Sequence, residues 1–326
     1  MKNSRMLSLV VLSVLLVAFG SGSAFGAGKY PEKSITIIVQ AGAGGGSDIF
    51  ARTLAASAEK DKLLPQPMIV ENKPGGSGGI AFAYVAGKKK DPYYLITAVT
   101  SFLTTPIMGL TPVSYKDFTP VANLAFDELV LMVNAKSKYK SVREIVDFAR
   151  ANPQKVTVGG TQLGGSDSIC THLIEKAAGI KFNFIVFNGG GEVNAALLGG
   201  HVDIAFGNPC EALELYKAGK VNLLGVFAQK RMAAAPDIPT MREQGLDAVL
   251  QSHRGLCAPA GIPADARKVL ETALFQYTKT EIFKKYVADN MLTEAWMNGE
   301  AYGKALDEWN AKYTAVLREM GLVKKK

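Results

Sequence analysis

Cysteine, histidine and tryptophan are scarce in this chain of 326 residues, which contains three, three and two of them. The cysteines and histidines are widely spaced: Cys170, Cys210, Cys257, His172, His201 and His253. No CxxC pair and no Cys/His ligand spacing occurs, so the sequence predicts no metal site and no disulfide framework. An exported chain could still oxidise two of the three thiols. Cys170 lies in a helical pattern beside Ile169 and Leu173, which predicts a buried thiol.

Long apolar runs are also absent after the first residues. Lys2 and Arg5 precede the apolar segment Leu7–Phe19, which is short for a membrane span, and small residues at 22–26 offer cleavage sites. We therefore predict a signal peptide at residues 1–26 that is cleaved on export, and a periplasmic mature protein.

The chain has only a modest excess of positive charge. The formal net charge is +8, and removal of Lys2 and Arg5 leaves 35 basic and 29 acidic residues, or +6. Runs of three lysines occur at 88–90 and 324–326, and neither is interleaved with aromatic residues. The pattern predicts no nucleic-acid partner.

Glycine, in contrast, is clustered. The stretch Ile35–Arg52 begins with an apolar strand, Ile35–Val39, continues through Gly42 to Gly46, and then reaches Ser47 and Asp48, residue types that cap a helix at Ile49–Ala58. A strand, a glycine loop and a helix N-terminus direct backbone N–H groups and the helix dipole at one small volume, which suits an anion. A tight turn without a ligand is the alternative.

Three further junctions repeat this design. The four glycine-rich strand-to-helix junctions lie at 42–48, 74–79, 160–167 and 188–192. Around them the chain alternates strands and helices, which predicts two α/β units with parallel strands. Crossings near 122–130 and 248–258 predict a two-strand hinge. Residues 263–321 are read as helices with no intervening strand, and they return to cover the first unit.

Two helix ends in the second unit carry local signals. Ser141 precedes an apolar stripe and is predicted to cap a helix at Val142–Ala151. Gly179 is predicted to end the helix Ser168–Ala178.

This organisation predicts a cleft between two lobes. The first lobe comprises residues 27–125 and 253–326, and the second comprises residues 126–252. Ligands of open parallel sheets bind beyond the carboxyl ends of the strands, where all four junctions lie. Main-chain N–H groups with Ser47, Ser77, Thr161, Ser166 and Asn188 would converge there on a small polar, anionic ligand.

Several motifs resemble other sites. The segment 42–47 nearly fits a dinucleotide fingerprint, with Glu71 as the ribose-binding acid, but its third position is Ser47 and an exported chain meets little of that cofactor. We predict no cofactor. The segment 75–79 fits a nucleophile elbow around Ser77, without a histidine that the sequence singles out as the base. A periplasmic serine hydrolase using Ser77 is therefore the enzymatic alternative.

Two charged residues near the junctions have two interpretations each. Asp48 is either a helix cap or a carboxylate that holds the loop or meets an amino group of the ligand. Arg254 is either a surface charge or a fixed cation facing the cleft that pairs with a carboxylate. We favour the cap for Asp48 and, slightly, the ligand role for Arg254.

Taken in order, the motifs resemble those of the extracytoplasmic solute-binding proteins of tripartite tricarboxylate transporters, the Bug family. The segments that carry the resemblance are Pro31–Arg52, Val70–Gly79, Gly164–Ser166, Gly189–Glu192, Gly199–Asp203 and Pro236–Thr240, with Arg254-Gly255-Leu256 near the hinge. They extend over essentially the whole mature chain.

The resemblance implies a type II periplasmic-binding-protein fold that closes on a small carboxylate: a di- or tricarboxylate, an acidic amino acid or an aromatic acid. It implies a non-catalytic monomer whose partners are the permease subunits of the transporter. A ligand-loaded partner of a membrane sensor is an alternative. By position, these residues would line the cleft: Gly44, Gly45, Gly46, Ser47, Asp48, Ser77, Thr100, Ser101, Thr161, Gly165, Ser166, Asn188, Gly189, Gly190 and Asn208.

The chain departs from the family pattern near this pocket. His253 stands where the family often has an aromatic residue, Val186-Phe187-Asn188 replaces a Pro-Tyr pair, and Gln40–Ala43 replaces a Pro-containing approach. The resemblance therefore predicts the fold and the class of ligand, and leaves the individual carboxylate open.

Overall fold

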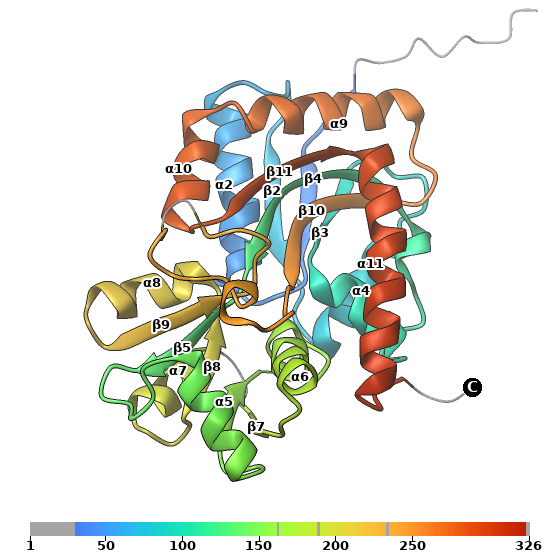
Figure 1. The fold of residues 1–326 in the computed structure, drawn as a ribbon. Helices are drawn as coiled ribbons and strands as arrows, with labels where there is room; N and C mark the ends of the chain where they lie inside the picture. Colours follow the sequence, from blue (N-terminus) through green and yellow to red (C-terminus); the bar gives the residue numbers. More distant parts are fainter. Residues whose placement is uncertain (1–29, 162, 188–189, 233–234, 324–326) are drawn as a thin grey trace, which may run out of the picture.

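The structure is a computed structural model, which describes residues 30–161, 163–187, 190–232 and 235–323. The predicted signal peptide, residues 1–26, lies outside the described residues. Within the described part, no helix is both long and apolar enough to cross a membrane. The described residues form two mixed sheets, one in the upper part and one in the lower part of Figure 1.

The first sheet has six strands in the order β11-β4-β10-β3-β1-β2. Their bounds are β1 Ile35–Val39, β2 Met68–Asn72, β3 Tyr94–Ala98, β4 Phe118–Glu128, β10 Gln251–Pro259 and β11 Thr293–Asn298. As the alternation of strands and helices predicts, β1 pairs in parallel with both β2 and β3. Strand β10 is antiparallel to β3 and β4, so the strand that returns from the second sheet lies between two strands of the outward path.

Helices cover both faces of the first sheet. The helices are α2 Gly46–Lys60, α3 Gly79–Ala86, α4 Thr100–Ile107, α9 Ala264–Tyr277, α10 Glu281–Asp289 and α11 Gly299–Glu319. Ile37 of β1 belongs to a core with residues of α2, α9 and α10, whereas its neighbour Ile38 belongs to a core with residues of α3, α4 and α11. Successive side chains of a strand point to opposite faces, which explains why β1 is apolar except at Thr36.

The second sheet has five strands in the order β7-β6-β8-β5-β9. Its strands are β5 Val130–Asn134, β6 Thr157–Gly160, β7 Asn183–Val186, β8 Ile204–Gly207 and β9 Val221–Val226, and its helices are α5 Val142–Ala151, α6 Ser166–Ala178, α7 Gly190–Leu198 and α8 Pro209–Lys217. The predicted cap of α5 is confirmed, because the Ser141 hydroxyl accepts a hydrogen bond from the Glu144 N–H. Gly179 ends α6 in the left-handed conformation, as predicted.

Two sequence predictions about elements are wrong. Strand β11 interrupts the segment that we read as helices alone, and it pairs with the edge of β4. Helix α2 begins at Gly46 with Gly45 as its cap residue, so neither Ser47 nor Asp48 caps it. The chain passes between the sheets from β4 to β5, and it returns before β10. The division into lobes at 125/126 and 252/253 stays a proposal.

Candidate functional site

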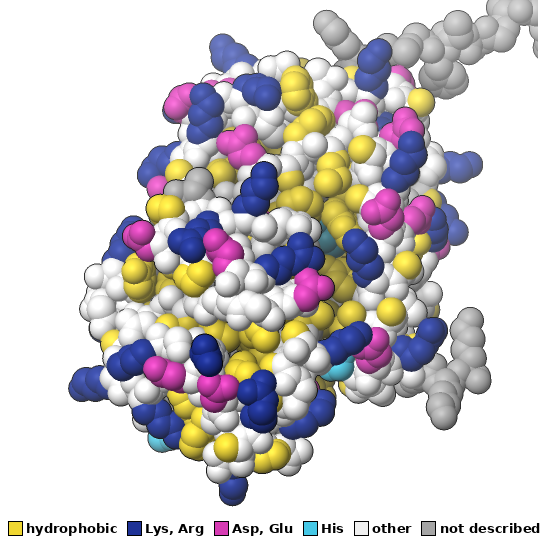
Figure 2. Space-filling view, viewed as in Figure 1, with side chains coloured by type: hydrophobic (Ala, Val, Ile, Leu, Met, Phe, Trp, Pro, Cys, Tyr) yellow, Lys and Arg dark blue, Asp and Glu magenta, His cyan; other side chains and the backbone are white. Residues whose placement is uncertain are grey.

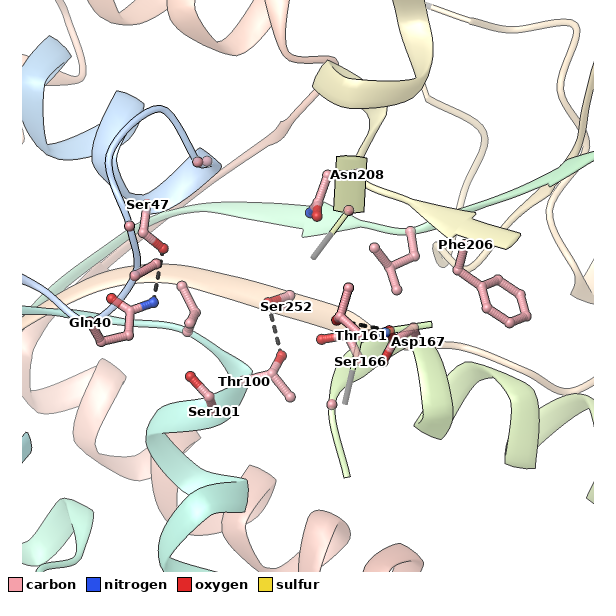
Figure 3. A pocket seen from close by; sticks show the side chains of 18 of the residues that line it. Gln40, Ser47, Thr100, Ser101, Thr161, Ser166, Asp167, Phe206, Asn208 and Ser252 are labelled. Carbon is pink, nitrogen blue, oxygen red and sulfur yellow. Dashed lines mark hydrogen bonds between the residues drawn. The ribbon is translucent and has the colours of Figure 1, made fainter. Parts of the chain in front are cut away.

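A cavity of about 550 Å³ lies between the two sheets, beyond the carboxyl ends of the strands that point toward it. Its walls come from the loop after β1, the start of α4, the loop after β6, the start of α7, the end of β8, and β10. Figure 3 shows Gln40 and Ser47 on one side, Thr161, Ser166 and Asp167 on the other, and Thr100, Ser101 and Ser252 between them. The cavity therefore lies at the carboxyl ends of strands, where the sequence predicts it.

The loop after β1 is held by the carboxylate of Asp48. Its Oδ2 accepts from the Gly44 N–H at 2.9 Å, and the side chains of Arg52 and Asn72 both donate to Oδ1. Burial favours the neutral acid, but the hydrogen bonds from Arg52, Gly44 and Asn72 outweigh it and lower the pKa of Asp48 below its ordinary value. Asp48 thus holds the loop in place. This is the alternative interpretation of Asp48, and the favoured one, a helix cap, is wrong.

Ser47, in the first turn of α2, brings a hydroxyl group to the cavity. Its hydroxyl oxygen accepts from Gln40 Nε2 at 3.0 Å and from Arg254 Nη1 at 3.2 Å. Gln40 is itself bound by the Thr97 hydroxyl. Because the Ser47 oxygen already accepts two hydrogen bonds, its own proton is available to a ligand in the cavity.

Arg254 lines the cavity and is 7% exposed. Its Nη2 forms an ion pair with Asp127, a residue of β4 that is fully buried. Arg254 is therefore no surface charge. Its positive charge is balanced within the protein before any ligand arrives.

Thr100 begins helix α4, and its hydroxyl donates to Ser252 of β10 at 2.8 Å. Ser252 and Arg254 are two residues apart in a strand, so both face the cavity, while His253 between them faces the opposite side.

The loop after β6 resembles the loop after β1 in construction. Gly44 and Gly164 both have φ near +80°, the N–H of each donates to a side chain four residues later, and the next glycine caps a helix. Both loops contain the letters GGSD, but the structure aligns Gly44 with Gly164, so Asp48 corresponds to Ser168 and Ser47 to Asp167. The repeated letters are one residue out of register with the repeated geometry.

Helix N-termini converge on this cavity without side-chain caps. The cap residues Gly45 of α2, Val99 of α4, Gly165 of α6 and Asn208 of α8 all line it, and none of these helices has a side-chain hydrogen bond at its cap. Among the helices whose cap residues do not line the cavity, α5, α10 and α11 are capped by side chains, whereas α3 and α9 are not. First-turn N–H groups are a helix's unsatisfied donors, and together they suit an anion.

The structure brings most of the sequence-predicted residues together. Those that line the cavity are Gly45, Gly46, Ser47, Thr100, Ser101, Thr161, Gly165, Ser166, Gly190, Asn208 and Arg254. Gly44, Asp48 and Ser77 do not line it. Asn188 and Gly189 lie outside the described residues, so their assignment stays a prediction.

Several lining residues are ones that the sequence analysis did not select: Gln40, Asp167, Asn194, Phe206 and Ser252. The alternation of side chains along β10 could have identified Ser252 once Arg254 was chosen. Asp167 lies within a junction that we had selected. The sequence gives no comparable signal for Asn194, which is in the body of α7.

Ser77 lies apart from this arrangement, in a short 3-10 turn, Gly76–Gly78, with φ of 56°. Its carbonyl oxygen accepts from the Thr105 hydroxyl at 2.8 Å. Within the described ranges, no hydrogen bond joins Ser77 to a histidine. His253 is buried against Trp309, and His172 contacts Glu319. Among the described residues, Ser77 therefore has no histidine in hydrogen-bond contact that could act as its base.

No group of three or more His, Cys, Asp or Glu residues suited to a metal ion occurs among the residues that the structure describes. Cys170 and Cys257 are buried free thiols, which agrees with the prediction for Cys170. On the face shown in Figure 2, Lys and Arg side chains are spread among Asp and Glu and form no continuous patch.

Comparison with known proteins places this geometry in context. Residues 50–322 match the model of the family described as "Tripartite tricarboxylate transporter family receptor". A relative from Cupriavidus necator, the UPF0065 protein in the gbd 5′ region, is 32% identical over 304 residues, which are 91% of this chain and 90% of the relative.

Solved structures share the fold. A TctC solute binding protein from Polaromonas, without ligand, is 30% identical with a TM-score of 0.75, over 89% of this chain and 100% of its own. MatC from Rhodopseudomonas palustris, solved with bound malate, is 24% identical with a TM-score of 0.76, over 88% of this chain and 100% of its own.

Proposed function

The chain belongs to the tripartite tricarboxylate transporter receptor family, and we propose that it captures a small carboxylate in the cavity between its two sheets for delivery to the permease subunits of such a transporter. Receptors of this family are periplasmic binding proteins rather than enzymes. The proposal carries with it a cleaved signal peptide at residues 1–26, a periplasmic location and a monomeric state.

The observation that carries this proposal is the convergence of uncapped helix N-termini. The cap residues of α2, α4, α6 and α8 line the cavity without a side-chain cap bond, and hydroxyl groups of Ser47, Thr100 and Ser101 lie among them. This donor-rich wall matches carboxylate oxygens, which only accept hydrogen bonds when ionised. The malate bound to the Rhodopseudomonas palustris protein is a ligand of this class.

The size and composition of the cavity also favour a small polar ligand. A volume of about 550 Å³ lies within the usual range for small-molecule sites. Of the described residues that line the cavity, Asp167 and Arg254 are the charged ones, and Arg254 is paired with Asp127. Specificity therefore depends on the placement of neutral donors more than on net positive charge.

A thermal-shift screen of mono-, di- and tricarboxylates, aromatic acids and amino acids tests the proposal. A ligand present at a hundred times its Kd adds about 2.7 kcal/mol to the free energy of unfolding, which raises the melting temperature measurably. Ser101→Ala is a suitable variant, because it removes a cavity hydroxyl, and it should weaken binding while the unliganded melting temperature stays close to that of the wild type. If no carboxylate in the panel shifts the melting temperature, the proposal is wrong.

A further inference from the structure

Asp167 places a carboxylate in the wall of a cavity that otherwise presents donors. It lines the cavity, is 7% exposed, and is the second residue of helix α6. The two other buried aspartates near the cavity are neutralised, Asp48 by Arg52 and Asp127 by Arg254. In the described part of the chain, Asp167 forms no ion pair.

The hydrogen bonds of Asp167 leave room for one more donor. Its Oδ2 accepts from the N–H and the hydroxyl of Thr161, and its Oδ1 accepts from the Ser168 N–H at 2.8 Å. A carboxylate has about four acceptor positions, so Oδ1 retains one. Because Asp167 lines the cavity, a ligand can supply the fourth donor.

The same carboxylate changes what the second sheet offers to an anion. Asp167 stands in the first turn of α6, where it already interacts with the positive end of that helix. A ligand carboxylate placed there would meet a like charge, whereas the starts of α2 and α4 and the Ser47 hydroxyl carry no such competitor at the cavity surface. The cavity is thus asymmetric: among the described residues, the wall from the first sheet has no unpaired carboxylate, whereas the wall from the second sheet combines donors with the Asp167 carboxylate.

We infer that the ligand is an amino acid, whose carboxylate is bound by the first-sheet wall and whose ammonium group pairs with Asp167. The inference rests on the proposed function and narrows its ligand class. An ammonium group supplies both the missing donor and the missing positive charge, which a plain carboxylate does not.

The protonation behaviour of Asp167 agrees with this assignment. Burial raises the pKa of Asp167 above its ordinary value, although the hydrogen bonds from Thr161 and Ser168 oppose the effect. An adjacent ammonium group would stabilise the ionised form. A second ligand carboxylate at the same place would destabilise it.

A purely structural role is the competing explanation, since Asp167 holds the Thr161 loop as Asp48 holds the Gly44 loop. The two explanations differ in one measurable respect. A structural role affects all ligands alike, whereas recognition of an ammonium group affects only ligands that have one.

The experiment uses three pairs of ligands that differ by an ammonium group at the α-carbon: aspartate and succinate, glutamate and glutarate, phenylalanine and 3-phenylpropanoate. Calorimetric titration of the full mature chain should give tighter binding of the amino acid in at least one pair. In Asp167→Asn, that amino acid should lose roughly ten- to hundredfold in affinity, the value of a charge-assisted hydrogen bond. Its desamino partner should change little or bind more tightly.

Ser168→Ala provides the matched structural control. The Ser168 hydroxyl accepts from the Gly164 N–H at 2.7 Å and donates to the Gly165 carbonyl at 3.1 Å, but Ser168 does not line the cavity. This variant loosens the same loop and keeps the charge of Asp167, so it should leave the ratio of the two affinities unchanged.

The outcomes separate this inference from the proposed function. If no amino acid binds more tightly than its desamino partner, or if Asp167→Asn weakens both members of a pair equally, the inference is wrong, while binding of other carboxylates still supports the proposed function. If no carboxylate binds at all, the proposed function itself fails.

Discussion

The buried ion pair of Arg254 and Asp127 places an arginine in the cavity wall without adding net charge. The two residues come from the neighbouring strands β10 and β4, and both are almost completely excluded from solvent. Loss of one partner of such a pair leaves a buried charge without compensation, which is costly. With its charge balanced by Asp127, Arg254 contributes a directed hydrogen bond to Ser47 and little net attraction for anions.

His253 lies on the opposite face of the same strand from Arg254. It is fully buried, its ring stacks on Trp309 with centroids 4.9 Å apart, and neither ring nitrogen has a hydrogen-bond partner among the described residues. Burial, and secondarily the charge of Arg254, lower the pKa of His253 to about 3. A histidine that must stay neutral in the native state makes folding sensitive to acid.

The substitution His253→Phe tests this sensitivity. The native pKa is below the unfolded value of about 6.5, so the unfolded state binds more protons between these values, and the wild type loses up to about 1.4 kcal/mol per pH unit as the pH falls. The variant lacks this loss. Urea unfolding at pH 7 and pH 5 should show its stability rising relative to the wild type by about 2 kcal/mol. Parallel pH profiles would contradict the assignment.

At the scale of elements, the sequence predicted helix α5 with its cap but not strand β11. Val142–Ala151 was identified with its Ser141 cap because an apolar stripe follows a capping residue. Strand β11 was missed because its apolar residues are limited to Ala295, Trp296 and Met297: half-buried or exposed along its length, it is an edge strand stabilised by pairing with β4. Long-range pairing of this kind leaves little local signal.

The GGSD segments illustrate a second limit. The repeated letters mark two glycine loops that line the same cavity, and by their spelling Asp48 and Asp167 would have the same role. In the structure the loop glycine donates to Asp48 in one loop and to Ser168 in the other, so Asp167 instead accepts from Thr161 and lines the cavity. A one-residue difference in where a helix begins is not visible in the sequence.

Helix caps provide a prediction at this scale. Asn298 caps α11 by accepting from the Ala301 N–H at 2.9 Å, whereas Asn208 occupies the cap position of α8 without a side-chain cap bond and lines the cavity. Asn298→Ala should therefore lower the free energy of unfolding by about 1 kcal/mol and leave ligand affinity unchanged. Asn208→Ala should weaken ligand binding and leave the free energy of unfolding nearly unchanged. Equal effects of the two substitutions on stability would contradict the idea that the cavity helices keep their first-turn donors for a ligand.

For the whole molecule, the sequence predicted two α/β units, helices that return to the first unit, and four junctions around one cleft, of which the junction at 74–79 does not line the cavity. Insertion of β10 between β3 and β4 could not be predicted, because β10 and β4 are more than 120 residues apart along the chain and their pairing is set by the completed fold. Contacts between the two units could not be predicted from the sequence either. Glu319 of α11 binds Lys176 of α6 at 2.9 Å, and Leu317 and Met108 lie close to Gly164.

The arrangement of two walls around one ligand predicts a change in overall shape. A ligand held by the loops after β1 and β6 favours conformations in which the two sheets approach, since each wall alone supplies only part of the hydrogen bonds. The radius of gyration measured by small-angle scattering should fall when the ligand found in the screen is added to saturation. The double variant Ser47→Ala/Thr100→Val, with weakened binding, should keep the larger radius at the same ligand concentration. An unchanged radius for the saturated wild type would show that binding needs no closure, and that both walls are already placed for the ligand in its absence.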